Sequence, residues 1–154
     1  MNALMPYPGL KKTLQYLVIQ ARESMPYIHK YIPDNINNPE DLFNYLRTQI
    51  TYKSDPKGEE YITTVKTLFN KNKGRGDCDD FTVLALASLS WFGYNPRIVL
   101  VGYNKVFPKH IYTAYYVNGK RFVFDLTNPW FDYERPNGPK GKPYKFRQEL
   151  KVNL

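Results

Sequence analysis

The sequence predicts an α+β fold, with N-terminal helices and a central cysteine-bearing helix packed on an antiparallel sheet. Apolar residues recur at helical spacing as far as Phe92, whereas the segments after Asn95-Pro96 alternate with a period of two. The pair Asn118-Gly119 then stands between two strand-like segments, which is a strong signal for a β-hairpin. Helices followed by hairpin-connected strands are typical of α+β domains.

Apolar spacing predicts three helices in the first half of the chain. The first covers residues 11–24, the second begins near Asn38-Pro39, and the third covers residues 59–69. The segment 25–39 is rich in proline and asparagine, so we expect a loop with a short turn there.

The central helix follows the sequence Gly74-Arg75-Gly76-Asp77-Cys78-Asp79-Asp80. Asp77 has the residue type and position of an N-cap, so Cys78 becomes the first residue of the helix. The following residues, as far as Phe92, are apolar on nearly every side of a helix, and Gly93 is a helix stop. Such a helix belongs in the middle of a core.

Strands are expected at residues 97–103, 110–117 and 121–126. The stretch 136–143 is rich in proline, glycine and lysine and is expected to be an extended surface segment. A chain of 154 residues is typical of a single domain, here 1–154, with a core over about residues 42–130 and a tail over about 136–154.

The hairpin turn predicts which residues share a face of the sheet. If Asn118-Gly119 forms a two-residue loop, Val117 pairs with Lys120 and Tyr112 lies opposite Asp125. His110 and Asp125 then lie on one face, a diagonal step apart and within reach of each other's side chains. A shift of one residue in register would place them on opposite faces.

These residues suggest a thiol nucleophile with a general base and an orienting acid. Cys78 lies at a helix N-terminus, where backbone N–H groups favour a thiolate, although the three aspartates beside it oppose one. His110 would activate the thiol and supply the balancing positive charge, and Asp125 would orient the imidazole. We expect the small side chain of Ala114 to let the cysteine helix approach the same face.

Composition excludes several other classes of protein. The single cysteine cannot form an internal disulfide, and no export signal or membrane-spanning run is visible, so we expect a cytoplasmic or virion-associated protein. The net charge of +8 is spread along the chain, with looser basic clusters at residues 66–75 and 140–151, which argues against specific nucleic-acid binding. Neither a metal nor an organic cofactor is expected, because the histidines and cysteine fail the usual ligand patterns.

The cysteine motif, the turn Gly93-Tyr94-Asn95-Pro96-Arg97 into a strand, His110 and the segment from Phe124 to Pro129 resemble the transglutaminase-like superfamily, in its compact phage or bacterial type. The resemblance implies a papain-like α+β fold and a catalytic triad of Cys78, His110 and Asp125. Many members have tryptophan two residues after the histidine, where this chain has Tyr112.

The implied activity is cysteine-dependent acyl transfer on a peptide or protein substrate. Water would complete hydrolysis of a peptide or amide bond, and an amine would complete transamidation. Tyr52, Gln49 and Tyr112 are candidates for oxyanion or substrate contacts. The alternative is a structural or binding protein, such as a virion component that contacts other virion proteins, with this fold and no catalysis.

Overall fold

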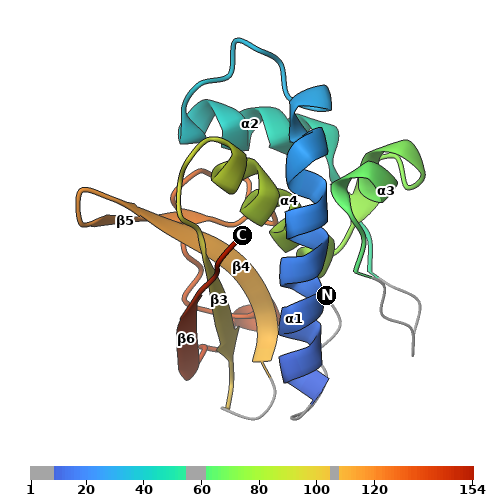
Figure 1. The fold of residues 1–154 in the computed structure, drawn as a ribbon. Helices are drawn as coiled ribbons and strands as arrows, with labels where there is room; N and C mark the ends of the chain where they lie inside the picture. Colours follow the sequence, from blue (N-terminus) through green and yellow to red (C-terminus); the bar gives the residue numbers. More distant parts are fainter. Residues whose placement is uncertain (1–8, 55–61, 105–107) are drawn as a thin grey trace.

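The computed structural model describes residues 9–54, 62–104 and 108–154 (Figure 1). Three helices, one of them a 3₁₀ helix, precede the first short strand, and the cysteine helix lies in the chain between the two short strands and the strands of the main sheet. The elements follow in this order: α1 (Gly9–Ser24), the 3₁₀ helix η1 (Met25–Lys30), α2 (Pro39–Gln49), β1 (Thr51–Tyr52), α3 (Val65–Asn70), β2 (Arg75–Gly76), α4 (Cys78–Trp91), β3 (Arg97–Gly102), β4 (Pro108–Val117), β5 (Lys120–Phe124), the 3₁₀ helix η2 (Pro139–Gly141) and β6 (Phe146–Lys151).

Helix α4 is the centre of the fold, as predicted. It lies between α1 and strand β4, and every residue from Cys78 to Leu89 is buried (Figure 1). Each fully buried leucine on it contributes about 1.5–3 kcal/mol through removal of apolar surface from water. At 14 residues α4 is too short to span a bilayer, and no other helix in the described ranges is long and apolar enough to do so.

The main sheet has four strands in the order β5-β4-β3-β6, and all its neighbouring pairs are antiparallel. The hairpin register is the predicted one: Val117 pairs with Lys120 and Thr113 with Phe124. Asn118 and Gly119 both have positive φ, 51° and 80°, as a two-residue type I′ turn requires. The turn therefore determines the register on which the placement of His110 and Asp125 depends.

Both faces of this sheet are buried, and they belong to different clusters. One face joins the main core with α4 and includes Ile98, Leu100, Ile111, Tyr115 and Phe124. The other face forms a second cluster made of Val99, Val101, Tyr112, Ala114 and Val123, with Tyr144 packed against it.

The expectation that α4 approaches the sheet at Ala114 is wrong. Ala114 belongs to the second cluster, whereas the residues of α4 pack in the main core with Ile111 and Tyr115. Successive side chains of a strand point to opposite faces, so Tyr112 and Ala114 face away from the α4 residues that pack with Ile111 and Tyr115. The register predicted which residues share a face but not which face receives the helix.

Two elements differ from the expectations for a physical reason. Helix α3 begins at Val65 instead of residue 59, because Thr64 caps it and Thr63 is held in a hydrogen bond to Asp80; residues 59–61 lie outside the described ranges. The expected extended tail contains strand β6, which pairs along the whole of β3 and gives the sheet its fourth strand. β6 is an edge strand whose side chains are all exposed or only partly buried, so its sequence lacks the alternation of a half-buried strand.

Strands β1 and β2 form a separate parallel pair that anchors the loop before Cys78. Thr51 N–H donates to Gly74 O (2.9 Å), and Lys53 N–H donates to Gly76 O (2.7 Å). Gly74 has φ of +81°, and a Cβ there would overlap the carbonyl oxygen of Gln49. Only glycine therefore fits at this approach between α2 and the loop that leads to Cys78.

We predict that Gly74→Ala lowers the free energy of unfolding by about 2–4 kcal/mol, because it adds an overlap to the strain of positive φ. Gly119→Ala is the matched control, since Gly119 has φ of +80° but open space around the added Cβ. The control should lose only about 1 kcal/mol. Urea unfolding measures both variants, and equal losses would contradict the close approach.

Candidate active site

Cys78 is the first residue of α4, directly after the N-cap Asp77. The Asp77 side chain accepts a hydrogen bond from Asp79 N–H (3.1 Å), and Asp80 Oδ2 accepts one from Asp77 N–H (3.1 Å). This reciprocal capping box satisfies backbone donors at a helix end that is buried. It fixes the position of Cys78 relative to the helix axis.

Thr82 joins the first turn of α4 to strand β4. Its hydroxyl donates to Cys78 O at 2.7 Å and lies 3.4 Å from Ile111 O. Ile111 directly follows His110 in the strand, so one side chain touches both the cysteine residue and the neighbour of the histidine. The helix start and the start of β4 are therefore packed together.

His110 is held by Asp125 across the hairpin. Its Nε2 lies 2.7 Å from Asp125 Oδ2, and the two side chains are only 14% and 3% exposed. The other carboxylate oxygen, Oδ1, accepts hydrogen bonds from Thr127 Oγ1 (2.7 Å) and from Thr127 N–H (3.0 Å). Asp125 thus caps the turn after β5 and also contacts the imidazole, and each role uses a different oxygen.

Burial acts to raise the pKa of the Asp125 carboxyl, but its partners outweigh this effect. The charge and hydrogen bond of His110, together with the two hydrogen bonds from Thr127, hold the pKa of Asp125 below its ordinary value. Asp125 is therefore ionised near neutral pH.

Tyr112 supports the imidazole instead of pointing its hydroxyl at the thiol. Its ring stacks on that of His110, with centroids 5.3 Å apart and an interplanar angle of 28°. The hydroxyl donates to Glu134 Oε2 (2.6 Å) and accepts from Arg147 Nε (3.2 Å). Burial, then the hydrogen bond and charge of Glu134, raise the pKa of Tyr112, so the hydroxyl keeps its proton. Since that proton is used by Glu134, an oxyanion contact by Tyr112 is not supported.

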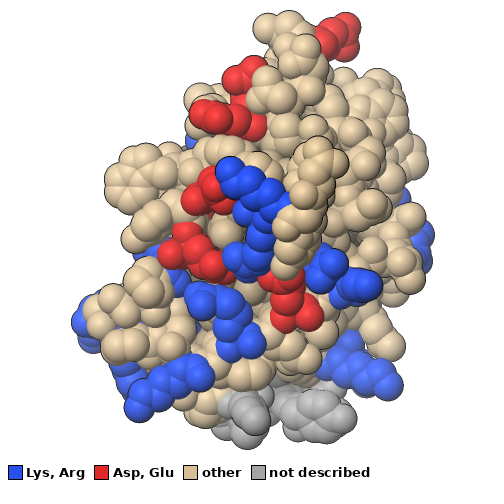
Figure 2. All heavy atoms as spheres, turned by 90° about the vertical axis from the view of Figure 1, so that its left-hand side faces the viewer, with Lys and Arg blue, Asp and Glu red and all other residues tan. Residues whose placement is uncertain are grey.

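Glu134 and its neighbours form a charged network on this side of the molecule. Arg121 donates to both carboxylate oxygens of Glu134 (2.8 Å each) and through Nε to Glu149 (2.8 Å). Figure 2 shows basic and acidic side chains interleaved on the side that carries β5 and β6. The network links β5, β6 and the segment after β5, and so fixes the partner of Tyr112.

The upstream candidates Tyr52 and Gln49 have different positions. Tyr52 pairs with Gly76 in the short parallel sheet. Its ring packs edge-on against that of Phe81, in the first turn of α4, with centroids 6.3 Å apart. Tyr52 is 50% exposed and thus lies beside the cysteine loop at the surface. The Gln49 amide donates to Thr48 Oγ1 (3.0 Å) and lines a hollow beside η1 and α3. The structure brings Tyr52, but not the side chain of Gln49, to the start of α4.

The Cys78 thiol is buried, with 1% of the residue exposed. Burial raises the pKa of this thiol well above its ordinary value, and the charges of Asp79 and Asp77 raise it further. Capping carboxylates and a thiolate compete for the same helix N-terminus, and the carboxylates are ionised first. The thiol is therefore protonated near neutral pH, so burial and the aspartates outweigh the effect of the helix N-terminus that was expected to favour a thiolate.

Tyr144 is a residue near this site that sequence reasoning missed. It packs against the second cluster and stacks on Tyr103, with centroids 5.6 Å apart. Burial raises the pKa of Tyr144 to about 12, and the charges of Tyr103, Asp125 and Cys78 also raise it. Tyr144 therefore packs on the face of the sheet that carries Tyr112. No spacing signal could reveal this, because Tyr144 lies in the segment expected as an extended tail.

Thr127 also lies beside His110 and Asp125, and the sequence contained a pattern that predicts its contact with Asp125. Its side chain contacts Asp125 and also lies 3.3 Å from His110 Nε2. An aspartate followed two residues later by threonine is typical of a turn capped by the carboxylate.

Within the described residues, no group of three or more His, Cys, Asp or Glu is arranged to hold a metal ion.

We predict that Thr127→Val lowers the free energy of unfolding at pH 7 by about 1.5–3 kcal/mol, because a buried carboxylate loses a hydrogen-bond donor. The pKa of Asp125 is lowered in the folded state, so its ionised form stabilises the fold above the unfolded pKa of about 3.9, and this contribution is lost as the pH falls through the folded pKa. The loss in Thr127→Val should therefore shrink below about pH 4.

Thr127→Ser keeps the hydroxyl and is the control for this measurement. Urea unfolding at several pH values should give a loss in Thr127→Ser well below that in Thr127→Val. A loss in Thr127→Val that is the same in acid and at neutral pH would contradict the assigned hydrogen bond to Asp125.

Comparison with known proteins agrees with this architecture. A family model described as the transglutaminase-like superfamily matches residues 26–126, while no curated protein matches the chain. The solved structures include a proposed cysteine protease from Cytophaga hutchinsonii, with a TM-score of 0.53 and 15% identity over 97% of this chain and 57% of that one. They also include a TGase, with a TM-score of 0.46 and 14% identity over 84% of this chain and 36% of that one.

The chain spans less than two thirds of either protein's length, and at such identity the likeness to the cysteine protease shows the fold alone. The family model, by contrast, covers more than half of the chain and includes the segments that carry Cys78, His110 and Asp125. The chain therefore belongs to the transglutaminase-like superfamily.

Proposed function

We propose that the chain is a cysteine-dependent acyl-transfer enzyme in which Cys78 is the nucleophile, His110 the general base and acid, and Asp125 the group that orients the imidazole. The observation that carries the proposal is the 2.7 Å contact between His110 Nε2 and Asp125 Oδ2, at the strand end that packs on the first turn of α4. A nucleophile, a base and an orienting acid from three separate elements are the parts that acyl transfer requires.

The contact with Asp125 supports one assignment of the two nitrogens of the imidazole. Asp125 is ionised and accepts, so Nε2 carries a proton and Nδ1 is the nitrogen that takes the proton of the Cys78 thiol. Sγ then attacks the carbonyl carbon of a peptide or amide, and the carbonyl π electrons move to the oxygen. His110 returns its proton to the leaving amine as the C–N bond breaks, which leaves a thioester on Cys78.

The second half-reaction repeats these roles. A water molecule loses a proton to His110 and attacks the thioester, the C–S bond breaks, and the proton returns to sulfur. A primary amine in place of water gives transamidation through the same thioester. We propose hydrolysis as the main reaction, since it needs no binding site for an acceptor amine.

The developing oxyanion needs hydrogen-bond donors that capping has not already used. The carboxylates of Asp77 and Asp80 take the N–H groups of Asp79 and Asp77. We therefore assign the oxyanion to the backbone N–H of Cys78 and the hydroxyl of Tyr52, a residue whose ring packs on Phe81 in the first turn of α4.

The raised pKa of Cys78 implies that proton transfer to His110 accompanies attack, instead of a thiolate–imidazolium pair at rest. We predict that iodoacetamide alkylates Cys78 near pH 7 about tenfold or more faster in the natural protein than in His110→Ala, because the imidazole removes the thiol proton. The rate is measured by mass spectrometry against pH, with Cys78→Ser as the blank and circular dichroism as the check of folding.

A specific observation favours the alternative of a non-catalytic scaffold, namely the burial of Cys78 beside carboxylates that oppose its ionisation. In that case both proteins would label slowly, and their rates would rise together only towards alkaline pH. Equal profiles in the natural protein and His110→Ala would remove the catalytic proposal and leave a structural or binding role, including the virion role considered from the sequence.

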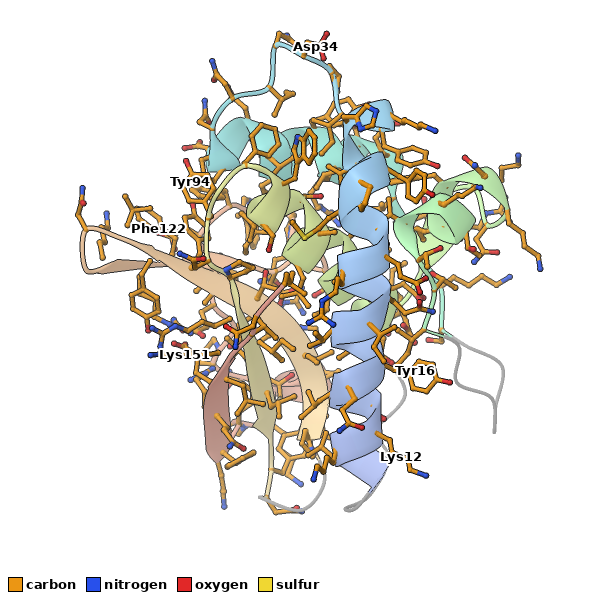
Figure 3. The ribbon with its side chains drawn as sticks, in the orientation of Figure 1. Lys12, Tyr16, Asp34, Tyr94, Phe122 and Lys151 are labelled. Carbon is orange, nitrogen blue, oxygen red and sulfur yellow. The ribbon has the colours of Figure 1, made fainter. Side chains whose placement is uncertain are left out.

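We predict that Tyr52→Phe lowers kcat on a peptide p-nitroanilide by about 10- to 1000-fold with little change in KM, because the hydroxyl acts on the oxyanion and not on the bound substrate. Tyr16→Phe is a suitable control, since Tyr16 is an exposed tyrosine on α1 (Figure 3). An unchanged kcat in Tyr52→Phe, or an equal drop in Tyr16→Phe, would refute the role of Tyr52.

A further inference from the structure

A hollow of about 660 Å³ lies between the end of β1, the end of α3 and strand β2. Its described lining includes the cations Lys53, Lys71, Lys73 and Arg75, and all four are exposed. Three of them belong to the basic cluster at residues 66–75 that the sequence showed without assigning a role. The volume falls within the range of roughly 300–1,000 Å³ that ligand sites occupy.

The hollow adjoins the loop that carries the proposed nucleophile. Gly76 and Asp80, on either side of Cys78 in the sequence, both line it. Lys53 N–H donates to Gly76 O (2.7 Å), which fixes this basic wall to the cysteine loop through the backbone. A substrate residue bound in the hollow would therefore be near the residue that reacts.

The positive charge of the hollow is not neutralised by described acids. Asp80 is the one carboxylate in its described lining, and its Oδ1 accepts from Thr63 N–H (3.0 Å) and Thr63 Oγ1 (3.1 Å), while Oδ2 accepts from Asp77 N–H. No described carboxylate forms an ion pair with any of the four cations. Clustered cations around a concave surface focus a positive potential and attract anions.

We propose that this hollow binds the acidic side chains of a peptide substrate, so that the enzyme selects acyl donors with aspartate or glutamate beside the reacting bond. This inference rests on the proposed acyl-transfer function, which requires a peptide to reach Cys78. Hydroxyl and amide groups of Ser54, Thr67 and Asn72 add hydrogen-bond donors to the same wall. Lysine and arginine with such donors are the usual partners of carboxylates.

The same cations could attract a nucleic acid, but the hollow lacks the other features of such a site. Its described lining contains no aromatic side chain on which a base could stack. The charge is also gathered in one concavity instead of along a stripe that follows a phosphate backbone. These points favour a short acidic peptide.

The test measures binding without turnover, in the Cys78→Ala protein. Fluorescence anisotropy at low salt compares a labelled glutamate-rich hexapeptide, its glutamine counterpart and a labelled oligothymidylate of similar length. We expect the glutamate peptide to bind about tenfold or more tightly than the glutamine peptide, and its affinity to fall as salt rises.

Lys71→Glu/Lys73→Glu reverses the charge at two exposed residues of the hollow that are not among the proposed catalytic residues. Its matched control is Lys140→Glu/Lys151→Glu, which gives the same net charge; Figure 3 places Lys151 on the sheet side of the molecule, away from α3. The first variant should weaken binding of the glutamate peptide by about tenfold or more, and the control by less than about twofold.

Equal binding of the two peptides, or an equal loss in both charge-reversal variants, would overturn the proposal. So would tighter binding of the oligothymidylate with the same dependence on Lys71 and Lys73, which would make the hollow a nucleic-acid site. Binding is measured in Cys78→Ala, so it does not depend on catalysis. If Cys78→Ala prefers the glutamate peptide but the natural protein cleaves neither peptide, the proposed activity alone is refuted. Turnover of both peptides with equal kcat/KM would refute this inference alone.

Discussion

The burial of α4 on every side is the constraint on which the rest of the structure depends. A helix end that is shielded from water must find acceptors for its first N–H groups within the chain. Asp77 and Asp80 supply them, and Thr63 donates two hydrogen bonds to Asp80 in turn. The segment before α3 is therefore tied to the helix start, and Cys78 is fixed at the one position where the capped loop enters the core.

The carboxylates that stabilise the helix start also determine the chemistry of the thiol. Together with burial, Asp79 and Asp77 raise the pKa of Cys78, so the fold favours the neutral thiol. The hairpin holds a further carboxylate, since Asp125 is ionised and lies 2.7 Å from His110 Nε2. Under the proposed function, reactivity therefore depends on two groups of carboxylates, one beside the Cys78 thiol and one beside the His110 imidazole.

Local signals in the sequence predicted the parts of the site that lie within one element or one hairpin. The cap pattern placed Cys78 at the helix start, and the Asn118-Gly119 turn determined the register that brings His110 to Asp125. The error at Ala114 has a physical origin, because both faces of the sheet are buried and alternation alone cannot tell which face meets α4. Contacts between distant elements, such as Tyr144 against the second cluster and β6 beside β3, carry no local pattern at all.

The net charge of +8 looks evenly spread along the sequence but is divided in the structure. On the sheet side, Arg121 and Arg147 are held by Glu134 and Glu149, so their charges stabilise strands and are largely neutralised. The cations around the hollow beside α3 have no described carboxylate in ion-pair contact. They are therefore available to an anionic ligand, whereas the paired arginines of the sheet side are not. Under the proposed function this attraction acts beside Gly76, where the chain turns into Cys78, and so it favours acidic substrates at the place where the thiol reacts.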